Sequence, residues 1–238
     1  MSWSSRAPRR RRWPLVLAGI VVLVVGLVIA SAVYADSHDP TGTAPSAAPT
    51  APDAAPAAGL TWPPNDVRWF SLQGTMVPLS LAHGPSTNDG VVASGFTHDP
   101  NGAVIAAVNV LTRSSGLAGD ETVFGPAIAR QTTGDVSGYL ASIRGVRAAL
   151  EQRGGAPATV VVGYRLVEVG VDDVRMDVLS RATNPARPSQ HALITGTARV
   201  RWLDGDWRLV VPTGAGRQVD QVPPGFAPMP GQQLTSAG

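Results

Sequence analysis

The chain has 238 residues, of which 44% are hydrophobic and 15% charged, and its formal net charge is +2. All nineteen basic residues are arginine, and cysteine is absent, which excludes disulfides, a thiol nucleophile, a lipid-modified cysteine and a cysteine metal site. The length leaves room for one soluble domain of ordinary size.

Residues 15–34 form an apolar run without a charge. As a helix this run would cover about 30 Å, the thickness of the hydrocarbon core of a bilayer. Arg6 and residues 9–12, all arginine, precede the run, whereas Asp36 and Asp39 follow it. The positive-inside rule therefore places the tail of residues 1–14 in the cytoplasm and everything after residue 34 outside the cell membrane, on a single span.

A cleaved signal peptide is the alternative, because residues 30–32 and 33–35 offer small side chains suited to cleavage. The length of the run and the interfacial position of Trp13 favour a retained anchor. Gly19, Gly26 and Ala30 would lie on one helix face and allow a second helix to approach, so a homo-oligomer remains open.

Residues 35–59 contain many prolines and alanines and almost no large apolar side chain, so they predict a disordered spacer. The charges divide unevenly along the chain. Five arginines precede the anchor, three aspartates lie in the spacer, and the part from residue 60 onward holds fourteen arginines against fourteen acidic residues. A neutral outer domain without a basic cluster in its sequence argues against binding to nucleic acid.

Residues 60–211 predict one extracytoplasmic α+β domain. Residues 67–72 and 75–79 fit a short edge strand pair or an extended arm, and Pro78 argues against a central strand. Asp99 and Pro100 begin a helix that runs to about Arg113. A second helix begins after Asp135 and ends at residues 154–155, two glycines, while residues 124–126 between the helices predict a loop.

The rest of the domain is rich in β-branched residues. Strands are predicted over residues 159–169, 174–180, 191–202 and 207–211, with a hairpin at Asp204-Gly205. Helices packed on a curved antiparallel sheet of about four strands, in a cone-like arrangement, would bury both sets of apolar residues. Residues 212–238 return to Gly and Pro and predict an irregular tail.

No residue is assigned a catalytic, cofactor-binding or metal-binding role. Asp99 in the pair His98-Asp99 is explained as a helix cap, and none of the four histidines has metal-ligand spacing to another. Asp172-Asp173 predicts a turn, and Trp202 and Trp207 predict cross-strand packing. If the curved sheet instead held a ligand or a reaction, the side chains expected to converge in its pocket are Tyr164, Asp177, His98 and His191.

Three segments, residues 79–85, 95–107 and 200–210, together carry a resemblance. They resemble an uncharacterised family of membrane-anchored proteins carried on integrative and conjugative elements of actinobacteria. The order of helices before sheet is similar to the nuclear-transport-factor-like domain of periplasmic type IV secretion subunits. The resemblance implies a setting and brings no site residues with it.

These observations together predict a non-enzymatic, single-pass membrane protein. Its external domain is expected to be an assembly or scaffold component of a conjugation or secretion apparatus, with other membrane or channel subunits as partners and no cofactor or metal. The Trp69-Phe70 segment and residues 212–238 are the expected docking segments. An external domain that binds a small ligand, or an enzyme of the cone fold, is the alternative function.

Overall fold

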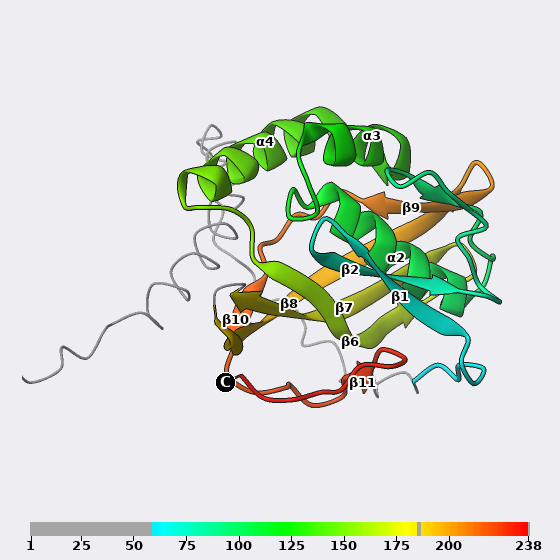
Figure 1. Cartoon of the computed structure of the whole chain (residues 1–238). Helices are drawn as coiled ribbons and strands as arrows, with labels where there is room; N and C mark the ends of the chain where they lie inside the picture. Colours follow the sequence, from blue (N-terminus) through cyan, green and yellow to red (C-terminus); the bar gives the residue numbers. More distant parts are fainter. Residues whose placement is uncertain (1–58, 185–186, 238) are drawn as a thin grey trace, which may run out of the picture.

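The computed structural model describes residues 59–184 and 187–237 (Figure 1). The predicted cytoplasmic tail and membrane helix lie outside the described residues, as does all but the last residue of the spacer. Within the described part of the chain, no helix has the length and apolar character needed to cross a bilayer.

The described part is an α+β domain in which a strongly curled sheet wraps around a helix (Figure 1). The main path of the nine-stranded sheet runs β1-β2-β6-β7-β8-β9-β5, β10 pairs with β8 and β11 with β6, while β3 and β4 form a separate small sheet. The bounds are β1 (Val67–Leu72), β2 (Thr75–Ser80), β3 (Thr87–Asn88), β4 (Ala93–Ser94), β5 (Thr132–Thr133), β6 (Ala158–Val169), β7 (Asp173–Asn184), β8 (Arg187–Leu203), β9 (Asp206–Val210), β10 (Arg217–Val219) and β11 (Ala227–Pro228).

The predicted α+β class, with helices packed on a curved sheet, is confirmed. The predicted transmembrane helix lies outside the described residues, and the prediction of about four antiparallel strands is too small. Four of the predicted strands correspond to β6, β7, β8 and β9, and the predicted pair at residues 67–72 and 75–79 corresponds to β1 and β2. The added strands of this sheet, β5, β10 and β11, are short and pair with residues far away in the sequence. Two of the pairings, β2 with β6 and β5 with β9, are parallel. Pro78 lies in β2, which stands between β1 and β6 and is not the edge strand that the proline favoured. Because β2 pairs with β6 only at Met76, the missing N–H of Pro78 does not interrupt the pairing with β6.

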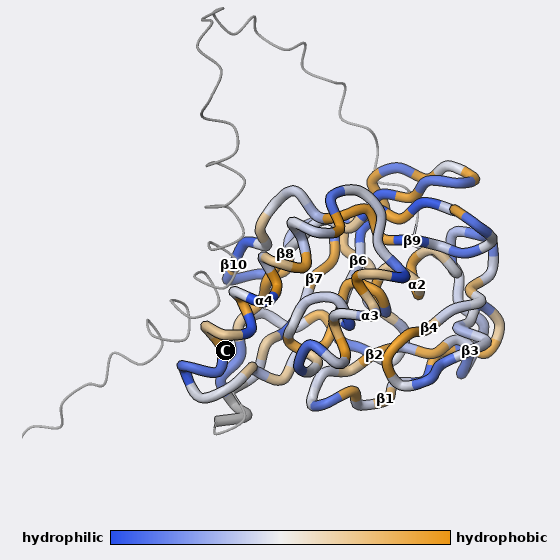
Figure 2. Tube along the Cα trace, turned by 90° about the horizontal axis from the view of Figure 1, so that it is seen from above, coloured by the Kyte–Doolittle hydropathy of each residue, from blue (hydrophilic) through white to orange (hydrophobic). Residues whose placement is uncertain are grey.

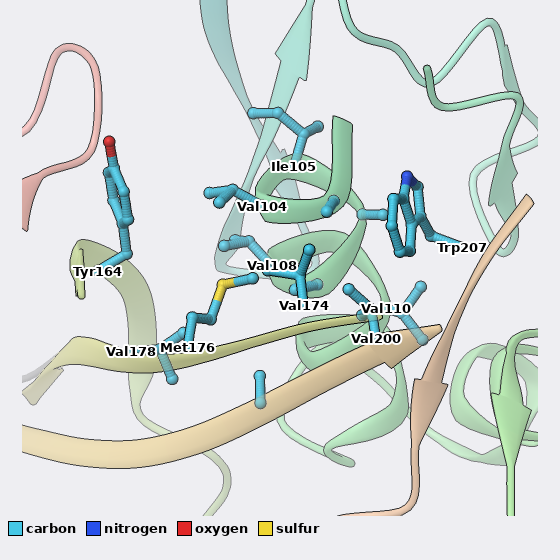
Figure 3. Packing of buried hydrophobic residues seen from close by; sticks show 14 of the residues in the cluster. Val104, Ile105, Val108, Val110, Tyr164, Val174, Met176, Val178, Val200 and Trp207 are labelled. Carbon is cyan, nitrogen blue, oxygen red and sulfur yellow. The ribbon is translucent and has the colours of Figure 1, made fainter. Parts of the chain in front are cut away.

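Helix α2 (Pro100–Ser114) fills the concave face of the sheet. Its predicted start is confirmed, because the carboxylate of Asp99 accepts a hydrogen bond from the Gly102 N–H. The side chains from Ala103 to Val108 are all fully buried. Figure 3 shows valines of α2 packed against Val174, Met176 and Val200 of the sheet. The small alanine side chains allow the helix backbone to lie close to the strands. Helix α2 therefore fills the space on the concave side of the sheet.

Helix α3 (Glu121–Gln131) corrects the prediction of a loop at residues 124–126. Pro126 lies inside this helix, where its ring removes one backbone hydrogen bond. Asp120 caps the helix start, and Phe124 and Ile128 are buried against the next helix. The capping and the burial together outweigh the cost of the proline, which the local sequence signal alone does not reveal.

Helix α4 (Val136–Gln152) matches the second predicted helix, and its Tyr139 is buried beside α2. Burial raises the pKa of Tyr139 to about 12, although a hydrogen bond with the Ser114 hydroxyl acts in the other direction. An unfolded tyrosine ionises near its ordinary pKa of about 10. The contribution of Tyr139 to stability is therefore complete below that pH and is lost as the pH rises toward 12.

Tyr139→Phe tests this linkage. The variant is expected to be less stable than the wild type by about 1 kcal/mol near neutral pH, because the bond to Ser114 is lost. Above about pH 10 the difference is expected to shrink, because only the wild type carries the ionisable group. Urea unfolding at pH 8 and near pH 11 measures the difference, and a difference that stays constant would contradict the assignment.

The C-terminal segment is mostly irregular, as predicted, but it packs against the sheet and forms two short strands. These strands are β10 and β11, and the segment covers part of the convex face of the sheet, below the strands in Figure 1. A second core lies there, formed by Val162, Leu179 and Leu193 of the sheet with Phe226 and Leu234 of the C-terminal segment. The short pairings of these strands depend on residues about twenty and sixty positions earlier, beyond the reach of local sequence patterns.

The predicted hairpin between the last two long strands is confirmed. Asp204 and Gly205 both have positive φ, at 54° and 81°, as a two-residue primed turn requires. Trp202 and Trp207 face each other across the hairpin, as predicted. Figure 2 shows hydrophilic residues at the outer turns and hydrophobic residues along α2 and the neighbouring strands.

Candidate functional site

The four side chains expected in an internal pocket do not converge. Tyr164 points into the concave face, where its hydroxyl accepts hydrogen bonds from the Leu60 N–H and the Trp62 indole. Asp177 faces the opposite side of the sheet and bonds Arg165. His98 lies before α2, and His191 contacts the Ser236 carbonyl oxygen near the C-terminal end. The concave face therefore offers no shared cavity to these groups.

His98 is the centre of an aromatic cluster at the start of α2. Its ring stacks on Trp202 with centroids 4.1 Å apart and planes 8° apart, and it meets the Trp207 ring in a T-shaped arrangement with centroids 5.7 Å apart. The Nε2 atom of His98 lies 2.8 Å from a carboxylate oxygen of Asp172. The cluster thus joins the segment before α2, the β6–β7 turn and the β8–β9 hairpin.

The predicted cap Asp99 has further partners. Burial acts to raise the pKa of Asp99, but hydrogen bonds from the Gly102 N–H, from Thr97 and from His83 outweigh it and hold the pKa below its ordinary value. His98 and Asp99 point to different partners and form no dyad. The carboxylate of Asp99 caps the N-terminus of α2.

Asp99→Ala is expected to lower the free energy of unfolding by about 1 kcal/mol, because α2 loses its cap. Asp99→Asn keeps a capping oxygen and is expected to cost less at neutral pH. Because the folded pKa of Asp99 is lowered, its charge-dependent contribution is present above about pH 4 and is lost as the pH falls through the folded pKa. Urea unfolding of the three proteins at pH 7 and at low pH measures both effects, and an alanine variant as stable as the wild type would contradict them.

Exposed apolar side chains gather at the same end of the domain. Val169, Val171 and Leu203 are 45%, 78% and 38% exposed, and they are three of the four large hydrophobic residues that are exposed within the described ranges. The Trp202 N–H donates to the Asp172 carbonyl oxygen, which holds the β6–β7 turn beside the hairpin. We call Val169, Val171, Trp202 and Leu203 the apolar end surface. Contiguous exposed apolar patches are common at surfaces that contact other macromolecules.

The Trp69-Phe70 segment is not a free arm. It belongs to β1, which pairs with β2 along six residues. The Trp69 indole donates to the Pro230 carbonyl oxygen, and the ring of Phe70 lies 5.9 Å from the guanidinium carbon of the buried Arg113. Both rings are used inside the domain, so we do not propose this segment for docking.

Asp172 and Asp173 gain partners that the sequence did not reveal. Asp172 bonds His98, which is 74 residues away, and Asp173 is in β7, where it accepts bonds from Arg199 and Arg201. Hydrogen bonds from Arg199 hold the pKa of Asp173 below its ordinary value. Among the described residues, no three His, Asp or Glu side chains are grouped so that they could hold a metal ion.

Comparison with known proteins identifies the family of the chain and no individual relative. Neither a curated protein nor a solved structure matches the chain. A family model for a domain of unknown function, DUF8175, matches residues 31–224, which is well over half of the chain. The chain therefore belongs to the DUF8175 family.

Proposed function

We propose that this chain is a single-pass membrane protein whose external domain is an assembly component of a conjugation or secretion apparatus. The observation that carries the proposal is the apolar end surface, where Val169, Val171 and Leu203 are exposed at the same end of the domain as the stacked rings of His98 and Trp202. A preorganised aromatic and aliphatic patch is suited to binding another protein.

Two further features support this proposal. The sequence resembles a family carried on conjugative elements, and the apolar run of residues 15–34 would tether the domain to the membrane. Helix α2 occupies the concave face of the sheet, which is the usual place for a ligand in cone-shaped folds. The protein would therefore work through its outer surfaces, by contact with neighbouring membrane or channel subunits.

Genetic complementation tests the proposal. Deletion of the gene is expected to reduce transfer of the element, and the wild-type gene is expected to restore it. A double variant, Val171→Asp and Leu203→Asp, is expected to fail, because two carboxylates would have to be buried in the contact. Ala141→Asp adds the same kind of charge on the exposed side of α4 and is expected to restore transfer. Unchanged transfer and channel assembly in the deletion strain would remove the proposal.

A further inference from the structure

A cleft opens on the convex face of the sheet, and none of its lining residues belongs to the apolar end surface. β8 pairs with β9 through residues 200–203 and with β10 through residues 193–195, so residues 196–199 have no strand partner on this edge. Between the two pairings the chain arches away from β8 over residues 211–216. The resulting cleft has a volume of about 670 Å³.

The cleft concentrates positive charge in a domain whose charges balance overall. Four arginines, at positions 165, 175, 199 and 217, line it together with a single carboxylate, Asp177. The sheet register puts Arg175 of β7 directly opposite Arg199 of β8. Like charges in directly opposed positions destabilise a sheet, and the carboxylates that pair with these two arginines reduce the repulsion.

The arginines are only partly neutralised by the protein. Arg165 bonds Asp177, Arg175 bonds Glu168, and Arg199 bonds Asp173. Within the described residues, Arg217 is exposed and forms no ion pair, and the Nε atom of Arg175 is buried without a hydrogen-bond partner. A guanidinium offers five N–H donors, so Arg175, Arg199 and Arg217 retain donors for an added anion.

The cleft also has an apolar wall. Val211 and Pro212 line one side, and Pro223 and Phe226 of the C-terminal segment line another. The guanidinium carbon of Arg165 lies 5.3 Å from the centre of the Phe226 ring, which fixes the ring at the edge of the charged row. A small inorganic anion would leave this wall unused, whereas a peptide that carries both carboxylates and apolar side chains would use both kinds of lining.

We propose that the cleft binds an acidic peptide segment of a partner protein, with its carboxylates on Arg175, Arg199 and Arg217 and an apolar side chain against Phe226. Bidentate pairing between a guanidinium and a carboxylate makes such a contact both strong and specific in its orientation. The site shares no residue with the apolar end surface.

Fluorescence anisotropy of the full chain in detergent, with a labelled synthetic peptide in which aspartate alternates with valine, tests the proposal. Arg217→Gln is expected to weaken binding about tenfold, as loss of a charge-assisted bond requires, without affecting folding, because Arg217 is exposed and has no ion pair to lose among the described residues. Phe226→Ala is expected to weaken binding as well. The control Arg153→Gln removes an exposed arginine at the end of α4 and is expected to bind like the wild type.

The other outcomes overturn the proposal. Equal binding of a peptide with asparagine in place of aspartate would show that the cleft does not recognise the negative charge of the peptide. Displacement by millimolar inorganic phosphate, combined with normal binding by Phe226→Ala, would identify a simple anion site. Much tighter binding after replacement of Asp36, Asp39 and Asp53 by asparagine would show that the acidic spacer of the chain itself occupies the cleft.

Discussion

Trp207→Ala is expected to lower the free energy of unfolding by about 3–5 kcal/mol, because it truncates a large ring in the middle of the core. Trp207 is 1% exposed and belongs to the main core with α2. Its indole N–H also donates to the Thr97 carbonyl oxygen at 2.9 Å, just before the helix begins. The variant therefore loses the packing of the ring and leaves a carbonyl oxygen without its donor.

Two further substitutions separate these contributions. Trp207→Phe keeps most of the packing and removes the hydrogen bond, so it is expected to cost less than alanine. Trp202→Ala removes the half-buried partner across the hairpin and is also expected to cost less. Urea unfolding followed by circular dichroism measures all three. A Trp207→Ala protein less than 1 kcal/mol below the wild type would show that the hairpin does not hold the start of α2.

Gly102→Ala is the second large effect, because the same junction has no room for one methyl group. A Cβ atom at Gly102 would overlap the Thr97 carbonyl oxygen, which belongs to the backbone and already accepts the Trp207 indole. The backbone before α2 must then shift, which costs about 1–3 kcal/mol. The hydrogen bond from the Gly102 N–H to Asp99 is expected to weaken with it.

Gly125→Ala is the matched control in α3. A Cβ atom there would meet only Glu121, at 3.4 Å, an ordinary contact. Alanine is a better helix former than glycine, so this variant is expected to gain about 0.5–1 kcal/mol. The two glycine substitutions therefore differ in sign. Thermal unfolding of both variants checks the difference, and destabilisation by both to the same extent would contradict the steric account.

Local signals carry much of this fold. Asp99 followed by Pro100 marks the start of α2, Asp204-Gly205 marks the hairpin, and β-branched residues mark the long strands. Helix α3 could not be predicted from local signals, because Pro126 normally ends a helix. The burial of Phe124 and Ile128, which stabilises α3, depends on a different helix. The C-terminal strands β10 and β11 could not be predicted either, because the strands with which they pair lie elsewhere in the sequence.

The candidate surfaces depend even more on register. His98 meets Asp172 across 74 residues, and no spacing in the sequence announces this contact. The arginine cleft leaves one trace, because Arg175 and Asp177, like Arg199 and Arg201, recur at the two-residue period of a strand. The arginines of the cleft come together only through the fold. The register of β7 with β8 aligns Arg175 with Arg199, and the pairing of β10 with β8 adds Arg217.

Crosslinking in the cell tests the central claim most directly. A photo-crosslinking amino acid is placed at position 171, in the apolar end surface, and at position 141 on α4 as the control. Adducts with identified subunits of a conjugation or secretion channel, or with a second copy of the chain, from position 171 and not from 141 are the predicted result. A correctly localised protein that gives no specific adduct from position 171, or gives the same adducts from both positions, would contradict an assembly role for this surface.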